Sequence, residues 1–193
     1  RLRWYYRLGV NPDRLRLRDH NPEELSHYSK ATSDIEVHYQ WGWGELEGIA
    51  HRGEYDLSAH ASHSGKSLSY FDPDRNEHII PHVVEPAVGV DRVMLMLLSD
   101  AYAEETLENG DQRTVLHFAP DGAPAEVAVI PLSRNEKLGP TARRVYDVVR
   151  PRFRSQYDDA QSIGRRYRRQ DEIGTPLAVT VDFDTIADDA VTI

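Results

Sequence analysis

A short segment rich in proline and glycine divides this chain into two parts with different secondary-structure patterns. Residues 120–124 read Pro-Asp-Gly-Ala-Pro, a composition typical of a connection between domains. Before this segment most apolar runs are short and predict strands, whereas after it strands alternate with helices. The change of order predicts one domain in residues 1–120 and a second in residues 121–193, the latter an α/β layer with a partly parallel sheet.

The first part carries several local signals. Asn21 followed by Pro22 is typical of a helix start. Alternation of apolar and polar residues predicts strands over 34–39 and 45–50, and the polar stretch 51–78 is expected to hold a helix and a hairpin loop. A strand is predicted over 79–85, ending at Pro86. The apolar run that follows Gly89 predicts a buried helix from residue 90 to about residue 105.

The same patterns predict the remaining elements on both sides of the boundary. Residues 109–111 are typical of a turn, and residues 114–118 of a strand. Strands are then predicted over 126–130, 155–157 and 177–183, and helices over 140–153 and 163–172.

The composition excludes several classes of protein. No run approaches the roughly 18 apolar residues that span a bilayer, and the first ten residues lack the apolar core of a signal peptide. We therefore expect a cytoplasmic protein with no membrane partner. The chain has no cysteine, which excludes disulfides and thiolate metal sites. Its formal charge of −9 argues against nonspecific coating of nucleic acid but is compatible with a local basic surface.

Two groups of acidic residues stand near strand ends. Glu45 and Glu47 alternate on one predicted strand, and such a pair is usually a solvated face. Glu85 is followed by Gly89 and then by Arg92, which opens the apolar helix. A carboxylate, a glycine that permits close backbone approach and an arginine at a helix N-terminus together favour a nucleotide site, because helix amides and the guanidinium both attract phosphate.

Three blocks of sequence resemble one family in the same order. The segment that begins Glu85-Pro-Ala-Val-Gly-Val-Asp-Arg is similar to motif 3 of class II aminoacyl-tRNA synthetases. Gly44-Glu-Leu-Glu-Gly-Ile-Ala-His-Arg resembles the preceding strand in glycyl-tRNA synthetases, and residues 157–176 resemble their anticodon-binding domain. The resemblance covers nearly the whole chain. It implies an α+β fold, with part of the class II antiparallel-sheet catalytic core followed by an α/β anticodon-binding domain.

The resemblance also implies a reaction and its ligands. Glycine would be activated with ATP to glycyl-adenylate and then transferred to the 3′ end of tRNA(Gly), by a homodimer that needs no covalent catalytic residue. ATP would contact six residues of the two blocks, and Glu45 would also ligate Mg²⁺, which prefers carboxylate and phosphate oxygens. These six residues are Glu45, Leu46, Gly89, Val90, Asp91 and Arg92.

The glycine site implied by the resemblance overlaps this segment. Glu85 would pair with the ammonium group of glycine, and the pocket would be shaped by Pro86, Ala87, Val88 and Gly89. One position departs from the family pattern. Serine is expected at position 87 in most relatives, and this chain has alanine there, so a hydroxyl contact is missing.

A cluster of arginines marks the second part. Arg165, Arg166, Arg168 and Arg169 surround Tyr167 on a predicted helix. The residues alone leave two interpretations open, since the arginines can form salt bridges with nearby Asp and Glu side chains or contact RNA. The resemblance favours a tRNA-binding role for all five residues, with arginines on phosphates and Tyr167 stacked on a base.

The resemblance further implies that the first two class II motifs precede Arg1 and that a last strand and helix follow Ile193. Two alternatives remain open. One is another class II synthetase, for threonine, proline or histidine. The other is a non-catalytic, synthetase-like nucleic-acid-binding subunit.

Overall fold

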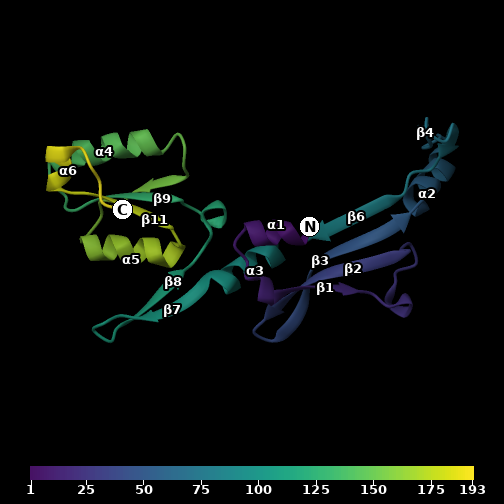
Figure 1. Cartoon of the computed structure of the whole chain (residues 1–193), viewed down its shortest axis with the longest axis horizontal. Coiled ribbons are helices and arrows are strands. Elements are labelled where there is room, and N and C mark those ends of the chain that lie inside the picture. The colour runs from purple at the N-terminus through teal and green to yellow at the C-terminus, as the bar shows by residue number, and fades with distance from the viewer. The chain divides into compact units, whose positions relative to one another are not determined.

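The computed structural model describes residues 1–193 and divides them into two compact units. One unit comprises residues 11–96, and the other comprises residues 1–10 together with 97–193. Figure 1 shows their elements along the chain. The compact units divide at other positions than the predicted domain boundary between residues 120 and 121. That boundary concerns domains that would fold separately, and it stays a prediction.

The unit of residues 11–96 is built on a four-stranded antiparallel sheet. The strand order is β1-β2-β3-β6, and every neighbouring pair is antiparallel. The strands are β1 (Leu15–Asp19), β2 (Ala31–Tyr39), β3 (Gly42–Gly53) and β6 (Val83–Val88). Between β3 and β6 lie helix α2 (Tyr55–Ser64) and the hairpin of β4 (Tyr70–Asp72) and β5 (Glu77–Ile79). The predicted α+β class is confirmed.

Short 3-10 turns flank β1. They are η1 (Pro12–Arg14) and η2 (Pro22–Glu24). Asn21 and Glu24 form a reciprocal capping box around η2, so the predicted start at Asn21-Pro22 is correct but opens only one turn.

A β-bulge at Leu46 decides which way the two glutamates of β3 point. Glu45 pairs with Glu36 and Glu47 pairs with Ile35, so Leu46 is the extra residue. Because Ile35 and Glu36 face opposite sides of the sheet, Glu45 and Glu47 also do. Glu47 is completely buried on the Ile35 side, and Glu45 is on the open side. The expectation that these two glutamates alternate along one solvated face is therefore wrong.

Strand β6 continues past Pro86, where the sequence predicted its end. Pro86 pairs with Ile49 inside the β3–β6 ladder, and the strand ends at Val88. β6 is the last strand of the four-stranded sheet, and an edge strand tolerates proline because one row of its backbone groups needs no partner.

The predicted long helix is shorter than expected and only partly buried. Helix α3 (Val90–Ala101) ends four residues before the predicted limit, and β7 (Tyr102–Thr106) follows it directly. β7 pairs with β8 (Gln112–Leu116) in a hairpin closed around Gly110. Met96 is fully buried, whereas Val90 is 81% exposed and Met94 is 59% exposed.

The second unit contains the expected parallel sheet. Its strands are β9 (Val127–Pro131), β10 (Ser155–Tyr157) and β11 (Leu177–Val181), in the order β10-β9-β11. Helices α4 (Leu138–Val149) and α6 (Phe183–Asp188) lie on one face, and α5 (Ile163–Ile173) lies on the other (Figure 1). Alternate residues of β9 and β11 pack with Ala142 of α4 in the core. The predicted α/β layer is confirmed, although α6 was not predicted.

Two short elements complete this unit, helix α1 (Leu2–Arg7) and the 3-10 turn η3 (Pro120–Gly122). None of the helices combines the length and the apolar character needed to cross a bilayer.

Candidate functional site

The open face of the antiparallel sheet carries a small cavity of about 200 Å³, which we call the sheet pocket. Strand register explains its floor. Gly48 pairs with both Asp34 and Ala87, and Ala50 pairs with both Thr32 and Glu85, so these side chains share one face. Because Gly48 and Ala50 of β3 and Ala87 of β6 are all small, the backbone of these two strands forms the floor of the pocket.

Carboxylates surround this floor. Asp34, Glu45 and Glu85 all line the sheet pocket. A Cβ atom at Gly48 would lie 3.6 Å from Asp34 Oδ1 and 3.7 Å from Glu45 Oε1, so two carboxylates approach the same point above the glycine. Asp34 is 7% exposed, and its Oδ2 lies 2.7 Å from His20 Nε2. The pocket therefore suits a small cationic group.

Arg52, which sequence analysis missed, holds Glu85 in place. Its Nη1 donates to Glu85 Oε2 at 2.8 Å, and its Nε and Nη2 donate to the two oxygens of Asp56 at 2.6 and 2.8 Å. The guanidinium also lies 3.9 Å from the ring centroid of Tyr28. This fixed geometry leaves Glu85 Oε1 available to a ligand. The sequence signals were the place of Arg52 at the end of the block that begins at Gly44 and its spacing of four residues from Asp56.

These ion pairs predict a loss of stability in acid. Hydrogen bonds from Arg52 hold the pKa of Asp56 below its usual range, and hydrogen bonds from Arg113 do the same for the pKa of Glu105. A depressed pKa contributes stability above the unfolded value of about 4, and this contribution is lost as pH falls through the folded value. Burial raises the pKa of Asp171, which acts in the opposite direction.

We therefore expect the melting temperature to fall as pH decreases from about 5 to about 3. Differential scanning calorimetry across this range measures it. Asp56→Asn should melt lower at pH 7 and lose less on acidification than the parent protein. An equal loss in both proteins would show that the Arg52–Asp56 pair does not contribute.

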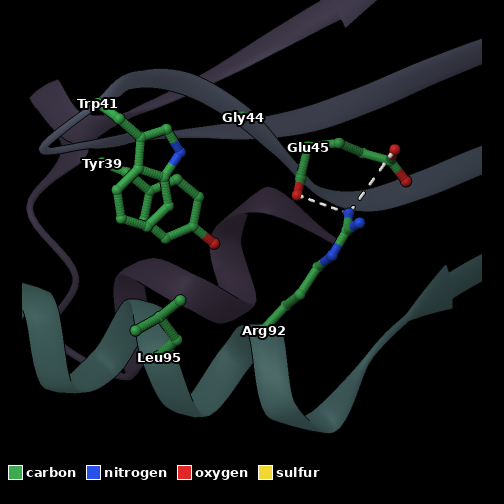
Figure 2. Close-up of a pocket in the computed structure, with 6 residues that line it drawn as sticks. All are labelled: Tyr39, Trp41, Gly44, Glu45, Arg92 and Leu95. Atoms are coloured by element: carbon green, nitrogen blue, oxygen red, sulfur yellow. Dashed lines mark hydrogen bonds and ion pairs between the residues drawn. The ribbon is translucent and has the colours of Figure 1, made fainter.

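A second cavity, which we call the aromatic pocket, places Arg92 beside Glu45. Arg92 Nη1 donates to the backbone oxygen of Glu45 at 2.9 Å and lies 3.7 Å from its Oε2 (Figure 2). The cavity measures about 270 Å³ and is also lined by Tyr39, Trp41 and Leu95. The rings of Tyr39 and Trp41 stack with centroids 4.6 Å apart. Arg92 and Glu45 are about half exposed, so both can reach a ligand.

The remaining predicted ligand residues are arranged differently. Leu46 is 1% exposed in the sheet core, so its side chain lines neither pocket, contrary to the prediction for ATP. Pro86 and Val88 alternate with Glu85 and Ala87 along β6 and therefore face away from the sheet pocket. Gly89 accepts a backbone hydrogen bond from Val93 as α3 begins.

Val90 and Asp91, at the start of α3, are exposed and line neither pocket. In the whole structure, no three His, Asp or Glu side chains form a cluster suited to a metal ion. Glu45 supplies one carboxylate as a possible metal ligand. One carboxylate is compatible with a Mg²⁺ ion that is held mainly by substrate phosphates and water.

The four arginines of α5 fall into two pairs. Arg166 and Arg169 have partners within the protein, whereas Arg165 and Arg168 are exposed. Arg166 is 1% exposed, and its guanidinium donates to the backbone oxygens of four residues. These acceptors are Pro131, Asp159, Ala160 and Gln161. Because a buried guanidinium cannot reach RNA, the tRNA-binding prediction for Arg166 is wrong.

Arg169 also has an internal role. It forms a bidentate pair with Asp158, with distances of 2.6 to 2.9 Å. The salt-bridge interpretation left open by the sequence is thus correct for Arg169. Arg165 and Arg168 are exposed and have no acidic partner. The hydroxyl of Tyr167 shares a hydrogen bond with Thr180, which restrains its ring.

Comparison with known proteins shows which proteins this chain resembles. Residues 126–193 match the family described as "Anticodon binding domain". The chain is 57% identical over 186 residues to the glycine–tRNA ligase of Clostridium acetobutylicum, covering 96% of this chain and 40% of that protein. It is 54% identical over 200 residues to the glycine–tRNA ligase of Thermobifida fusca, covering 100% of this chain and 43% of that protein.

The glycine–tRNA ligase of Acetivibrio thermocellus is 53% identical over 190 residues, which cover 98% of this chain and 41% of that protein. The chain thus spans about two fifths of the length of the curated relatives it matches. The chain is similar to glycine–tRNA ligases along its whole length, and its residues 126–193 match the anticodon-binding domain family.

Proposed function

We propose that the protein containing this chain is a glycine–tRNA ligase, which uses ATP to activate glycine and transfers the glycyl group to tRNA(Gly). The sheet pocket is the observation that carries the proposal. Its floor of Gly48, Ala50 and Ala87 admits little beyond a small molecule, and its carboxylates attract an ammonium group. Glycine is the amino acid with an ammonium group and no side chain.

The residues of the sheet pocket would bind and orient glycine. Glu85 offers Oε1 to the ammonium group while Arg52 holds Oε2, and Asp34 adds a second negative charge nearby. The carboxylate of glycine then attacks the α-phosphorus of ATP, and pyrophosphate leaves. Such a reaction depends on positioning and charge neutralisation, so it needs no covalent residue from the protein. Ala87 offers no hydroxyl, so polar contacts at the floor must come from neighbouring strands.

The aromatic pocket would hold part of ATP. Arg92 uses one nitrogen on the Glu45 backbone oxygen, which leaves its other nitrogens for a phosphate or for stacking on the adenine ring. A Mg²⁺ ion bound to the phosphates would take Glu45 as one oxygen ligand and neutralise phosphate charge. Gly89 has no side chain, so the backbone would leave room for the nucleotide at the start of α3.

The proposal includes tRNA(Gly) as the acceptor, a homodimer as the active form and the cytoplasm as its location. The match of residues 126–193 to anticodon-binding domains supports tRNA as a partner. The identity of 51–57% to glycine–tRNA ligases supports glycine over threonine, proline or histidine. The carboxylates and Arg92 around the two pockets support a catalytic protein over a non-catalytic relative.

The test is ATP–pyrophosphate exchange by the full-length protein with single amino acids. We expect exchange with glycine and at least roughly 100-fold less with alanine or serine, since one additional group that the pocket does not accommodate is worth up to about 3 kcal/mol. Radioactive pyrophosphate incorporated into ATP measures the rate. Equal exchange with several amino acids would exclude a glycine-specific enzyme, and no exchange with any amino acid would favour the non-catalytic alternative.

A further inference from the structure

A histidine and an aspartate form a hydrogen-bonded pair in the wall of the sheet pocket, and the proposed binding of glycine leaves the histidine without a role. His20 follows β1, and Asp34 lies on the neighbouring strand β2. His20 Nε2 lies 2.7 Å from Asp34 Oδ2, and both side chains line the pocket. We call these two residues the His20–Asp34 dyad.

The partner of each ring nitrogen determines where His20 carries its proton. A carboxylate only accepts hydrogen bonds, so Nε2 donates to Asp34. In the neutral ring Nδ1 then holds a lone pair. No hydrogen bond or ion pair in the structure involves Nδ1. The dyad therefore offers a nitrogen that can accept a proton, and Asp34 would stabilise the imidazolium that forms.

Asp34 connects the dyad to the floor of the pocket. Its second oxygen, Oδ1, lies 3.6 Å from the position of a Cβ atom at Gly48. Glu85, which would bind the ammonium group of glycine, lines the same cavity of about 200 Å³. In glycine a single carbon separates the ammonium group from the carboxylate. The carbonyl carbon of a bound glycyl group would therefore lie in the same small cavity as the dyad.

Three hydroxyl side chains line this pocket together with His20. Ser26 is exposed, whereas Tyr28 and Thr32 are half-buried. Thr32 lies next to His20, because its backbone oxygen accepts a hydrogen bond of 2.9 Å from the backbone nitrogen of His20. Hydroxyl groups both donate and accept hydrogen bonds, so they match the hydroxyl groups of a ribose. A ribose is the group that has to approach glycyl-adenylate during transfer to tRNA.

We propose that the His20–Asp34 dyad is the general base for transfer of glycine to tRNA, an inference that rests on the proposed function. The oxygen of the terminal ribose hydroxyl forms a bond to the glycyl carbonyl carbon, and its proton passes to His20 Nδ1. The bond between that carbon and the phosphate oxygen breaks, and AMP leaves with the bonding electrons. His20 then releases the proton to water, which restores the dyad.

Other ionisable groups surround His20. Arg18 and Glu24 form an ion pair, and Glu24 also interacts electrostatically with His20. The other ionisable residues that line the pocket are Tyr28, Asp34, Glu45 and Glu85. All of these groups stay in place when His20 is replaced. Only the part of the pH dependence that disappears with the histidine therefore belongs to the proposed base.

His20→Gln tests the proposal in the full-length protein, because a glutamine amide can still donate to Asp34 but cannot accept a proton. Glycyl-adenylate is formed on the enzyme from glycine and ATP, and rapid mixing with a tRNA(Gly) transcript gives the single-turnover rate of transfer. We expect the ratio of this rate to the rate of glycine-dependent exchange to fall at least about 100-fold, since general-base catalysis contributes about 100-fold or more.

His38→Gln is the matched control. His38 is an exposed histidine on β2, the strand that carries Asp34, and it lines neither the sheet pocket nor the aromatic pocket. Its ratio of transfer to exchange should stay within about twofold of the parent protein, the precision expected of two rate measurements. A ratio in His20→Gln that also stays within this range would overturn the proposal.

The pH dependence distinguishes a proton acceptor from a residue that only positions the ribose. In the parent protein the transfer rate should fall as pH decreases, because a protonated His20 cannot accept the hydroxyl proton. His20→Gln should lose this part of the dependence. A transfer rate that does not vary with pH in the parent protein would overturn the proposal. A slow variant that keeps the parent's pH dependence would overturn it as well.

Chemical rescue separates the loss of a base from damage to the fold. His20→Ala removes the ring, so imidazole added to the solution should raise its transfer rate, whereas His38→Ala should not respond. Circular dichroism shows whether each variant is folded. A folded His20→Ala variant that imidazole does not rescue would count against the base.

Failure of the dyad and failure of the proposed function give different results. Absence of glycine-dependent exchange in the parent protein would refute the ligase, and the role of the dyad with it. Normal glycine exchange together with an unchanged ratio of transfer to exchange in His20→Gln would refute the dyad and leave the ligase.

Discussion

Replacing Arg166 with Met is expected to lower the free energy of unfolding by about 3–5 kcal/mol, because four backbone carbonyl oxygens lose the donor that holds them. The guanidinium binds the oxygens of residues 159–161 and of Pro131, so it joins the loop after β10 to the end of β9. Methionine fills a similar length but donates no hydrogen bond, which leaves these carbonyls without their partner.

Urea denaturation followed by circular dichroism measures this loss. Arg165→Met is the matched control, because the neighbouring side chain is exposed and without an acidic partner, and its change should stay within about 0.5 kcal/mol. Equal stability of the two variants would show that the hydrogen bonds of Arg166 do not hold the loop. The comparison also separates the structural arginines of α5 from its exposed arginines.

Glu85→Gln is expected to raise the glycine concentration needed for half-maximal exchange by roughly 30- to 1000-fold, which corresponds to about 2–4 kcal/mol. Glutamine keeps the shape of the side chain but removes the charge that attracts the ammonium group. The dependence on ATP should change little, because Glu85 lines the sheet pocket and not the aromatic pocket. Arg92→Gln should show the reverse, with weakened use of ATP.

Steady-state exchange with glycine and ATP varied in turn measures both effects. Arg52→Gln should reproduce part of the Glu85 defect, since Glu85 Oε2 loses its partner at 2.8 Å. Glu36→Gln is a suitable control, because Glu36 forms a comparable pair with Arg16 in the same sheet and lines neither pocket. If Glu85→Gln and Arg92→Gln altered only the ATP dependence, the proposed division of the ligands would be wrong.

The sequence by itself determined many of the local elements. It also indicated that an antiparallel-sheet part precedes an α/β part along the chain. The strand over residues 155–157 was predicted with its observed bounds, and the helix from residue 163 with an error of one residue. Such segments are specified by periodicity, since burial of one side repeats every 2 residues in a strand and every 3.6 in a helix. The blocks at Glu45, Glu85 and residues 157–176 likewise indicated the family.

Elements that depend on a distant partner were not predictable in this way. The helix that begins at residue 90 was predicted to run on to about residue 105, but residues 102–106 form β7, because they pair with β8 across the turn at Gly110. The sequence also gave no signal for the bulge at Leu46. It sends Glu45 and Glu47 to opposite faces, so only one of two similar glutamates can meet a ligand.

Only the tertiary structure decided which charged side chains are free. Arg166 shares its side of α5 with Ile163, Gln170 and Ile173, at about 100° per residue, and that side packs on the sheet. Arg165 and Arg168 point the other way. Arg52 and Glu85 are 33 residues apart and meet because β3 pairs with β6. A sequence specifies the charge of each residue, but solvent access and pairing depend on contacts between segments that are remote along the chain.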